Sequence, residues 1–250
     1  MNLLTLARDL QRRKARERQG LFVAEGIRAV EELLRSSIRI RGALVAPSLD
    51  QTGRGAQLRA SLAARTPVSE LSQADFESAA STESPQGVLA VGEVPRHDLE
   101  RLTLPAHVRV LLLDAIQDPG NAGTMLRTAA ALGAAATLAL PGTVDLWNAK
   151  VVRSAMGAHF HHVALHCTWE AADAFLDRGS LALWAADTRG APLDPPSAPD
   201  RLALVVGNEG AGLSPETHAR SPTVVTLPIA SDIESLNVAV ATGIFLYELR

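Results

Sequence analysis

The chain has 250 residues, of which 4% are aromatic and one, Cys167, is a cysteine. This composition excludes a disulfide framework and favours a reducing compartment. No apolar run approaches the ~18 residues of a membrane helix and the first twenty residues lack an apolar signal core, so we expect a cytoplasmic protein without a membrane partner.

The charge of the chain is unevenly distributed. Residues 1–46 carry ten basic and five acidic side chains, a net charge of +5, so the remainder totals −8 within the overall −3. A basic end on an acidic body indicates a segment that faces RNA or phosphate, although a solvated amphipathic helix would have the same composition. Only Lys14 and Lys150 are lysines, so cationic contacts fall to arginine, which binds phosphate bidentately.

Residues 1–94 predict a small α/β domain. Two helices come first, and the pattern then predicts a strand at 40–46, helices at 57–65 and 73–80, and a strand at 87–94. The polar segment between Pro95 and Pro105 is typical of a linker. We therefore expect a first domain over 1–94, a linker over 95–106 and a second domain over 107–250.

The second domain opens with a continuous apolar run at 108–114, which predicts a strand buried on both faces. A helix over 122–132 follows, for which Asn121 is the expected N-cap and Gly133 the C′ residue. The pattern then predicts strands and helices in alternation, with strands at 135–140, 162–166, 181–187, 202–208 and 224–228 and helices at 146–160, 168–177, 214–220 and the C-terminus. This alternation indicates a mostly parallel sheet covered on both faces.

Three predicted strand ends carry polar or glycine-rich sequences, and ligands of open α/β sheets bind beyond such ends. The first, "NAGTMLR", places Asn121 and Arg127 at the start of a helix. A helix N-terminus suits phosphate, but a simple cap and a surface arginine would give the same sequence.

The second strand end, "VVGNEGAGLSPE", contains Gly207, Gly210 and Gly212, which let the backbone approach a ligand. No Gly-Lys-Ser/Thr follows, and no G-x-G-x-x-G turn is present, so neither a P-loop nor a dinucleotide fingerprint is predicted. Glu209 stands between Gly207 and Gly210, and the formation of a turn does not explain a glutamate at this position.

The third strand end, "LPIASDIESLNVAVATGIFLYELR", leads into an almost wholly apolar helix. Ser235 is the expected N-cap of this helix, and Asn237 is not needed as a cap. Polar groups at the tip of a buried helix require partners, which indicates a site at this end of the sheet.

These three stretches, in this order, resemble the motifs of the SpoU (TrmH-like) branch of the SPOUT RNA methyltransferases. The family's N-x-G…R motif is similar to "NAGTMLR" at 121–127, its G-x-E-x-x-G-L motif to "GNEGAGL" at 207–213, and its final P…S-L-N-V motif to "LPIASDIESLNVAVA" at 227–241. The N-terminal segments "RQGLFVAEGIRAVEELL" and "TESPQGVLAV" resemble the substrate-binding domain of ribosomal RNA members. Ser231 and Ala239 depart from the family, which often has glycine and serine there.

The resemblance implies an α/β fold in which the second domain forms a deep trefoil knot, a rare exception to the rule against knots. It implies a smaller N-terminal α/β domain with a ribosomal-protein-like fold, and a homodimer built on the knotted domain and the last helix. It also implies S-adenosylmethionine as cofactor, contacted by Gly207, Leu227 and Leu236, with Val206, Ile229 and Pro141 as neighbours. The expected partner is RNA, above all ribosomal RNA, bound through the Arg-rich first domain.

The implied reaction is transfer of a methyl group to a ribose 2′-hydroxyl. The resemblance assigns proton removal to Arg127, but a guanidinium normally stays protonated, so stabilisation of the developing alkoxide is an equal alternative. Asn121, Glu209, Ser235 and Asn237 would orient Arg127 and the ribose. No metal is required.

Other functions fit the sequence less well. His159, His161, His162 and His166 do not converge on one face, so we expect no metal site, and nothing near Cys167 marks an activating base. A nucleotide-binding Rossmann enzyme would need a glycine-rich turn that is absent. A tRNA 2′-O-methyltransferase and a non-catalytic RNA-binding module of the same fold remain as alternatives.

Overall fold

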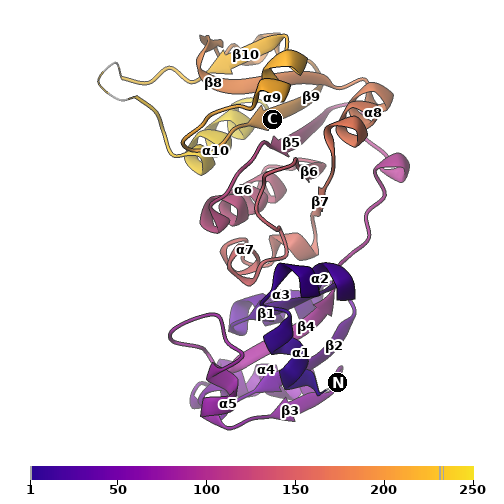
Figure 1. Ribbon diagram of the computed structural model, residues 1–250, viewed down its shortest axis with the longest axis vertical. Helices are drawn as coiled ribbons and strands as arrows, with labels where there is room; N and C mark the ends of the chain where they lie inside the picture. Colours follow the sequence, from indigo (N-terminus) through magenta and orange to yellow (C-terminus); the bar gives the residue numbers. More distant parts are fainter. Residues whose placement is uncertain (1, 231, 233) are drawn as a thin grey trace. The chain divides into compact units, whose positions relative to one another are not determined.

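In the computed structural model, which describes residues 2–230, 232 and 234–250, the chain divides into two compact units (Figure 1). The first contains the residues up to Arg96 and also Trp147–His161. The second contains His97–Leu146 and His162–Arg250. Compared with the predicted domain over 107–250, the second unit also contains residues 97–106, predicted as linker, and lacks Trp147–His161, which groups with the first unit.

The first unit is built on a four-stranded sheet with the order β1-β4-β2-β3, in which only β2 and β3 are parallel. Its strands and helices are α1 (Leu3–Asp9), α2 (Arg13–Gln19), β1 (Leu21–Glu25), α3 (Ile27–Arg35), β2 (Ile40–Val45), η1 (Pro47–Gln51), α4 (Gly53–Ala63), β3 (Val68–Glu70), α5 (Gln73–Glu77), β4 (Val88–Glu93), α7 (Ala149–Ser154) and η3 (Ala158–Phe160). The sequence pattern did not predict β1 or β3.

Aromatic packing explains why Trp147–His161 groups with the first unit. The fully buried ring of Phe22, on β1, lies 4.5 Å from the ring of Trp147 and 5.7 Å from that of Phe160, measured between centroids. The helix predicted over 146–160 is instead two short helices, α7 and η3. They are separated at Met156 and Gly157, whose φ angles of 51° and 91° are left-handed and cannot continue a helix.

The second unit is built on a six-stranded parallel sheet with the order β10-β8-β9-β5-β6-β7, which confirms the predicted α/β class. Its elements are η2 (Leu99–Arg101), β5 (Val108–Leu113), α6 (Pro119–Ala131), β6 (Ala136–Ala139), β7 (Val163–His166), α8 (Trp169–Gly179), β8 (Ala182–Pro192), η4 (Pro195–Ser197), β9 (Arg201–Val206), α9 (Pro215–Arg220), β10 (Thr223–Thr226) and α10 (Val238–Glu248). Every residue of β5 is buried, as its apolar run predicted.

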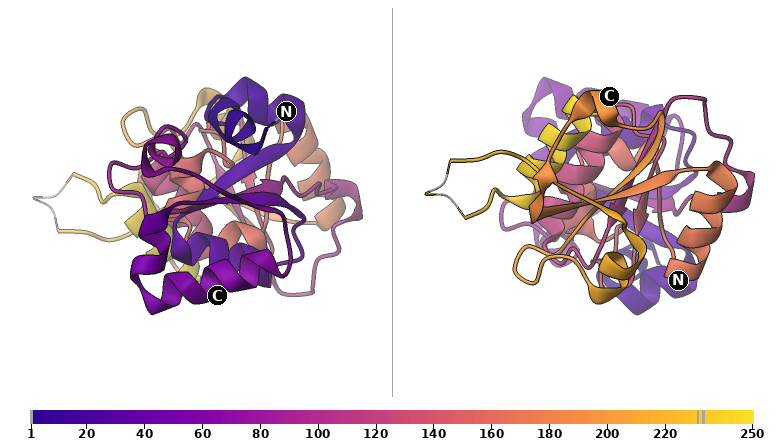
Figure 2. Two further views of the ribbon diagram at one scale, coloured as in Figure 1. Left: turned by 90° about the horizontal axis from the view of Figure 1, so that it is seen from below. Right: turned by 90° about the horizontal axis from the view of Figure 1, so that it is seen from above.

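Helices α6 and α10 lie side by side in the second unit (Figure 2). Their caps differ from the predicted ones. The N-cap of α6 is Asp118, whose side chain accepts a hydrogen bond from Asn121 N, and Pro119 occupies the first turn. The N-cap of α10 is Asn237 and not Ser235. Gly133 does follow α6 in the left-handed region, with φ of 78°, as predicted. Within the described residues, no helix has the length and apolar character needed to cross a membrane.

Candidate active site

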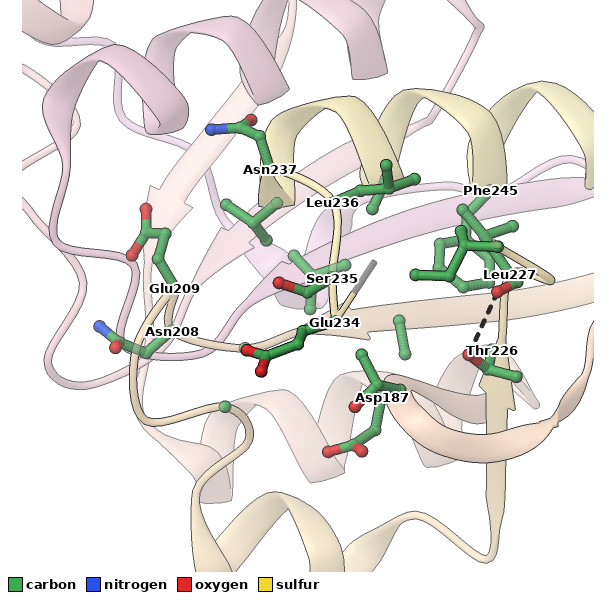
Figure 3. A pocket seen from close by; sticks show the side chains of 18 of the residues that line it. Asp187, Asn208, Glu209, Thr226, Leu227, Glu234, Ser235, Leu236, Asn237 and Phe245 are labelled. Carbon is green, nitrogen blue, oxygen red and sulfur yellow. Dashed lines mark hydrogen bonds between the residues drawn. The ribbon is translucent and has the colours of Figure 1, made fainter. Parts of the chain in front are cut away.

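The second unit contains a cavity of about 730 Å³ at the carboxyl ends of β9 and β10, beside the middle of β8 (Figure 3). This is the edge at which parallel sheets bind ligands, and the volume lies in the range of small-molecule sites. The lining residues are Ala186, Asp187, Thr188, Val206, Gly207, Asn208, Glu209, Gly210, Gly212, Thr226, Leu227, Pro228, Ile229, Ala230, Glu234, Ser235, Leu236, Asn237, Val238, Ala241 and Phe245.

One wall of the cavity is the loop that follows β9. Backbone hydrogen bonds join Asn208 and Gly212 in both directions, at 2.8 and 2.9 Å, and close the loop on itself. A Cβ on Gly207 would lie 2.5 Å from the carbonyl carbon of Gly212, so only glycine fits at position 207. Gly212 has a left-handed φ of 73°. These two glycines are therefore required by the loop itself, before any ligand is considered.

Two side chains hold this loop against the neighbouring strand end. Asn208 Nδ2 donates to the carbonyl of Ala115, two residues after the end of β5, at 2.9 Å. The buried carboxylate of Asp114 accepts hydrogen bonds from Ser214 N, at 2.7 Å, and from the hydroxyl of Thr217 at the start of α9. The polar residues at the end of β5 thus position the glycine-rich loop.

A chain of three polar side chains joins the three motifs. Asn121 Nδ2 donates to Glu209 Oε1 at 2.7 Å, and Asn237 Nδ2 donates to Asn121 Oδ1 at 3.1 Å. Asn237 Oδ1 in turn accepts from Ala239 N and Val240 N and so caps α10. Because Oδ1 is used by the helix, the Asn237 amide is fixed with its NH₂ group toward Asn121. The order Asn237–Asn121–Glu209 is therefore set by the start of α10.

Apolar side chains form the opposite wall of the cavity. Ile229 and Leu236 each expose 37% of their surface, unusually much for such residues, and both line the cavity. Leu227 and Phe245 lie beside Leu236 in the same wall (Figure 3). A ligand with one apolar face would cover surface that is otherwise in water.

Most of the predicted site residues meet at this cavity. Among its lining residues are the predicted Val206, Gly207, Glu209, Leu227, Ile229, Ser235, Leu236 and Asn237. Asn121 is not in the wall and joins it through its two hydrogen bonds. Arg127 is exposed on α6, and neither it nor Pro141 lines the cavity. Ser231, named above for its departure from the family, lies outside the described residues.

The structure adds residues that the sequence did not indicate as part of a site, chiefly Asp187, Glu234 and Phe245. Asp187 lies within β8. Burial opposes its ionisation, yet hydrogen bonds from the side chain and backbone of Arg189 outweigh this effect and lower the pKa of Asp187. An acidic residue directly after an apolar run was the available signal, as it was for Asp114.

Hydrogen bonds and burial account for His162, His166 and Cys167. His162 is buried and shares a hydrogen bond of 2.8 Å with Thr137, and His166 Nε2 accepts from Leu146 N. Burial raises the pKa of the Cys167 thiol to about 11, so it is protonated at neutral pH. Among the described residues, no group of three or more His, Cys, Asp and Glu side chains could hold a metal ion.

A parallel sheet with a nucleoside-sized cavity at its carboxyl edge, flanked by fixed amides and a carboxylate, defines an α/β enzyme domain that binds a small cofactor. Residues 108–247 match the SpoU rRNA Methylase family, and residues 5–90 match the MRM3-like substrate binding domain. The chain belongs to the SpoU rRNA methylase family, which confirms the resemblance found in its motifs.

Relatives extend this similarity over nearly the whole chain. The 23S rRNA (guanosine(2553)-2′-O)-methyltransferase RlmP of Bacillus subtilis is 35% identical over 244 residues, 97% of this chain and 94% of the relative. The SpoU methyltransferase AviRb of Streptomyces viridochromogenes, solved with AdoMet, has a TM-score of 0.88 at 27% identity, covering 100% of this chain and 97% of that one. The AdoMet-bound rRNA methyltransferase of Sinorhizobium meliloti has a TM-score of 0.84 at 28% identity, covering 99% and 94%.

Proposed function

We propose that the protein transfers a methyl group from S-adenosylmethionine to a ribose 2′-hydroxyl of ribosomal RNA. The observation that carries this proposal is the chain Asn237–Asn121–Glu209 at the edge of an apolar-walled cavity. It brings together one residue from each of the three motifs. A protein that only binds RNA has no need of such a chain beside a cofactor-sized cavity.

The lining of the cavity fits this cofactor. Gly207, Leu227 and Leu236, with Val206 and Ile229, offer backbone groups and apolar surface to a nucleoside, and carboxylates lie nearby. The bound cofactor would supply the electrophilic methyl group. The half-exposed Ile229 and Leu236 would be covered by it.

The remaining polar residues act on the ribose. The fixed amides of Asn121 and Asn237, with the hydroxyl of Ser235, would position the 2′-hydroxyl, and Glu209 holds Asn121 in its orientation. A guanidinium stays protonated at any accessible pH. We therefore assign Arg127 the stabilisation of negative charge on the ribose oxygen, and not removal of its proton.

The RNA is proposed to bind through the first unit. This unit matches a substrate-binding domain and carries the excess of arginine. Several of its arginines are largely exposed even where they pair with an acid, among them Arg12, Arg18 and Arg39. Exposed arginines suit the phosphates of a structured RNA.

We further propose a cytoplasmic homodimer whose second unit carries the trefoil knot of the family. Support for the dimer comes from α10, where Val240, Ile244 and Tyr247 are exposed at 53%, 39% and 50%. Their spacing of four and three residues puts them on one face of the helix. An apolar face of this kind is typical of a subunit interface.

The proposed reaction is tested with methyl-labelled cofactor and unmodified ribosomal and transfer RNA as separate substrates, followed by identification of the labelled nucleosides. We expect label on a ribose of ribosomal RNA. Label confined to transfer RNA would change the substrate class. Absence of both transfer and cofactor binding would contradict the methyltransferase proposal and leave an RNA-binding module.

A further inference from the structure

The charged side chains that line the cavity all have the same sign. Asp187, Glu209 and Glu234 are acidic, and no lysine, arginine or histidine is among the lining residues in the described part of the chain. Glu209 belongs to the polar chain with Asn121. Asp187 and Glu234 come from other segments, β8 and the stretch before α10, and lie among the cavity side chains in Figure 3.

The Asp187 carboxylate is held firmly within the wall. Its side chain is only 9% exposed, and Oδ1 accepts hydrogen bonds from Arg189 N at 2.9 Å and Arg189 Nε at 3.2 Å. Oδ2 lies on the side of the glycine-rich loop, 4.0 Å from where a Cβ of Gly212 would be. Asp187 Oδ2 lies 3.5 Å from Arg189 Nη2, a distance at which a hydrogen bond is weak.

The two charges of this ion pair lie in different surroundings. The Arg189 side chain is 81% exposed, so water and salt screen its positive charge. The carboxylate of Asp187 is buried beside the cavity, where the effective dielectric is lower and its field is stronger. A ligand in the cavity therefore experiences mainly the negative charge of the pair, together with those of Glu234 and Glu209.

We propose that Asp187, supported by Glu234, makes the cavity select the cationic cofactor over the neutral product of the reaction. This inference rests on the proposed function. In methyl transfer the bond between sulfur and the methyl carbon breaks, the sulfur keeps the electron pair, the carbon bonds to the ribose oxygen, and the proton of that hydroxyl passes to water. S-adenosylmethionine thus carries one positive charge more than S-adenosylhomocysteine. An acidic cavity binds the first more tightly, relative to the second, than a neutral cavity would.

The test is calorimetric titration of the full-length protein with S-adenosylmethionine, S-adenosylhomocysteine and sinefungin, an analogue with an amine in place of the sulfonium. Asp187→Asn keeps the shape of the side chain and removes its charge. We expect the Kd of both cationic ligands to rise about tenfold, as for loss of one charge interaction near a protein surface, and that of the neutral product by about twofold or less. Arg189→Gln removes the counter-charge and should shift the preference in the opposite direction by no more than about twofold, because water and salt already screen that charge.

Asp173→Asn is the matched control, because Asp173 pairs with Arg220 and does not line the cavity. It should leave the preference for cationic ligands unchanged. Equal weakening of all three ligands by Asp187→Asn would overturn the inference and leave Asp187 a structural role. If Asp187→Asn does not fold, the same comparison of the three ligands with Glu234→Gln decides, because Glu234 is an exposed residue of the cavity wall. A native protein that binds none of the three ligands would instead contradict the proposed function.

Discussion

Gly207 and Gly210 stand three residues apart in the same cavity loop, yet the structure gives them different constraints. A Cβ at Gly207 would meet backbone atoms of Gly212 and Leu213 at 2.5–2.6 Å, closer than real contacts allow. At Gly210 the nearest atom would be Asn208 Oδ1, at 3.7 Å, which is an ordinary contact. Only one of these two glycines is therefore fixed by packing.

We expect Gly207→Ala to open the loop and abolish measurable binding of S-adenosylmethionine, since backbone and not a flexible side chain would have to move. Gly210→Ala is the matched control and should change the cofactor Kd by less than about threefold, within the usual range for surface changes. Calorimetric titration of both variants checks this. Equal losses in the two variants would show that contact with the cofactor, and not the closure of the loop, requires the glycines.

We expect the stability of the second unit to depend on pH because of His162. Burial, and secondarily the charge of His97, lowers its pKa from 6.5 to about 4. The unfolded chain then binds this proton at a higher pH than the native one does. The free energy of unfolding should be unaffected by this group above pH ~6.5 and fall by up to about 3 kcal/mol as the pH drops to ~4.

Replacing His162 by Gln keeps a polar partner for Thr137 and removes the titration. Urea unfolding at pH 7, 6, 5 and 4 should show a shallower loss of stability in His162→Gln than in the parent protein. Parallel curves for the parent and His162→Gln would exclude this histidine as a source of acid sensitivity.

Helix α10 is the element on which the site depends, and the structure fixes both of its ends. Asn237 caps the first turn. At the other end, the buried guanidinium of Arg109 donates to the carbonyl of Leu249 and to those of Val108, Pro199 and Asp200. Burial lowers the pKa of Arg109, although the nearby Asp200 partly counteracts this. The end of α10 is thus tied to the starts of β5 and β9.

Arg109→Met would keep the apolar stem and leave several buried carbonyls without a donor. We expect a loss of about 3 kcal/mol in unfolding free energy and faster hydrogen exchange at residues 245–250. Arg201→Met is a suitable control, because Arg201 also donates to two carbonyls, those of Gly179 and Pro105, but not to α10. Unchanged exchange in α10 of the Arg109 variant would show that the helix is held by its apolar face alone.

Asn237 has two roles at the first turn of α10, capping the helix and orienting the polar chain, and substitutions can separate them. Asn237→Ser keeps a capping oxygen and loses the donor to Asn121. We expect nearly native stability but a fall in kcat of about a hundredfold, as for a displaced reacting group. In Asn237→Ala, which also loses the cap, we expect the free energy of unfolding to fall by about 1 kcal/mol in addition. A fully active Ser variant would mean that Asn237 serves only the helix.

At the scale of the whole molecule, the chain forms two units that are not consecutive in sequence, because Trp147–His161 belongs with the first. The apolar face of α10 also concerns the whole molecule. In a single chain its residues Val240, Ile244 and Tyr247 are exposed to solvent. The first feature reflects packing between distant segments of the chain, and the second is the surface that we propose a second subunit covers.

We expect Ile244→Glu to convert the proposed dimer into a monomer, because it places a charge in the centre of the proposed apolar interface. Analytical ultracentrifugation at micromolar concentration measures the change. Ala219→Glu adds the same charge at an exposed position of α9 and should leave the dimer intact. A parent protein that sediments as a monomer would contradict the proposed interface.

The strands of the second unit were the most predictable part of this protein. All six strands predicted in the second domain are present, and the inner strands β5, β6 and β9 are largely apolar because both of their faces are buried. Exact helix starts were less predictable. Asp118 and Asn121, like Ser235 and Asn237, are all good capping residues, and local sequence does not decide between two such candidates.

The sequence by itself determined the α/β class, the family and the three motifs, because each depends on residues close together in the chain. Only the tertiary structure decided that Asn237, Asn121 and Glu209 form one hydrogen-bonded chain, that Asp187 faces the cavity, and that Trp147–His161 packs around Phe22. These partners lie many residues apart. Their contacts follow from the order in which the strands assemble and from how the helices pack, and no local pattern encodes that order.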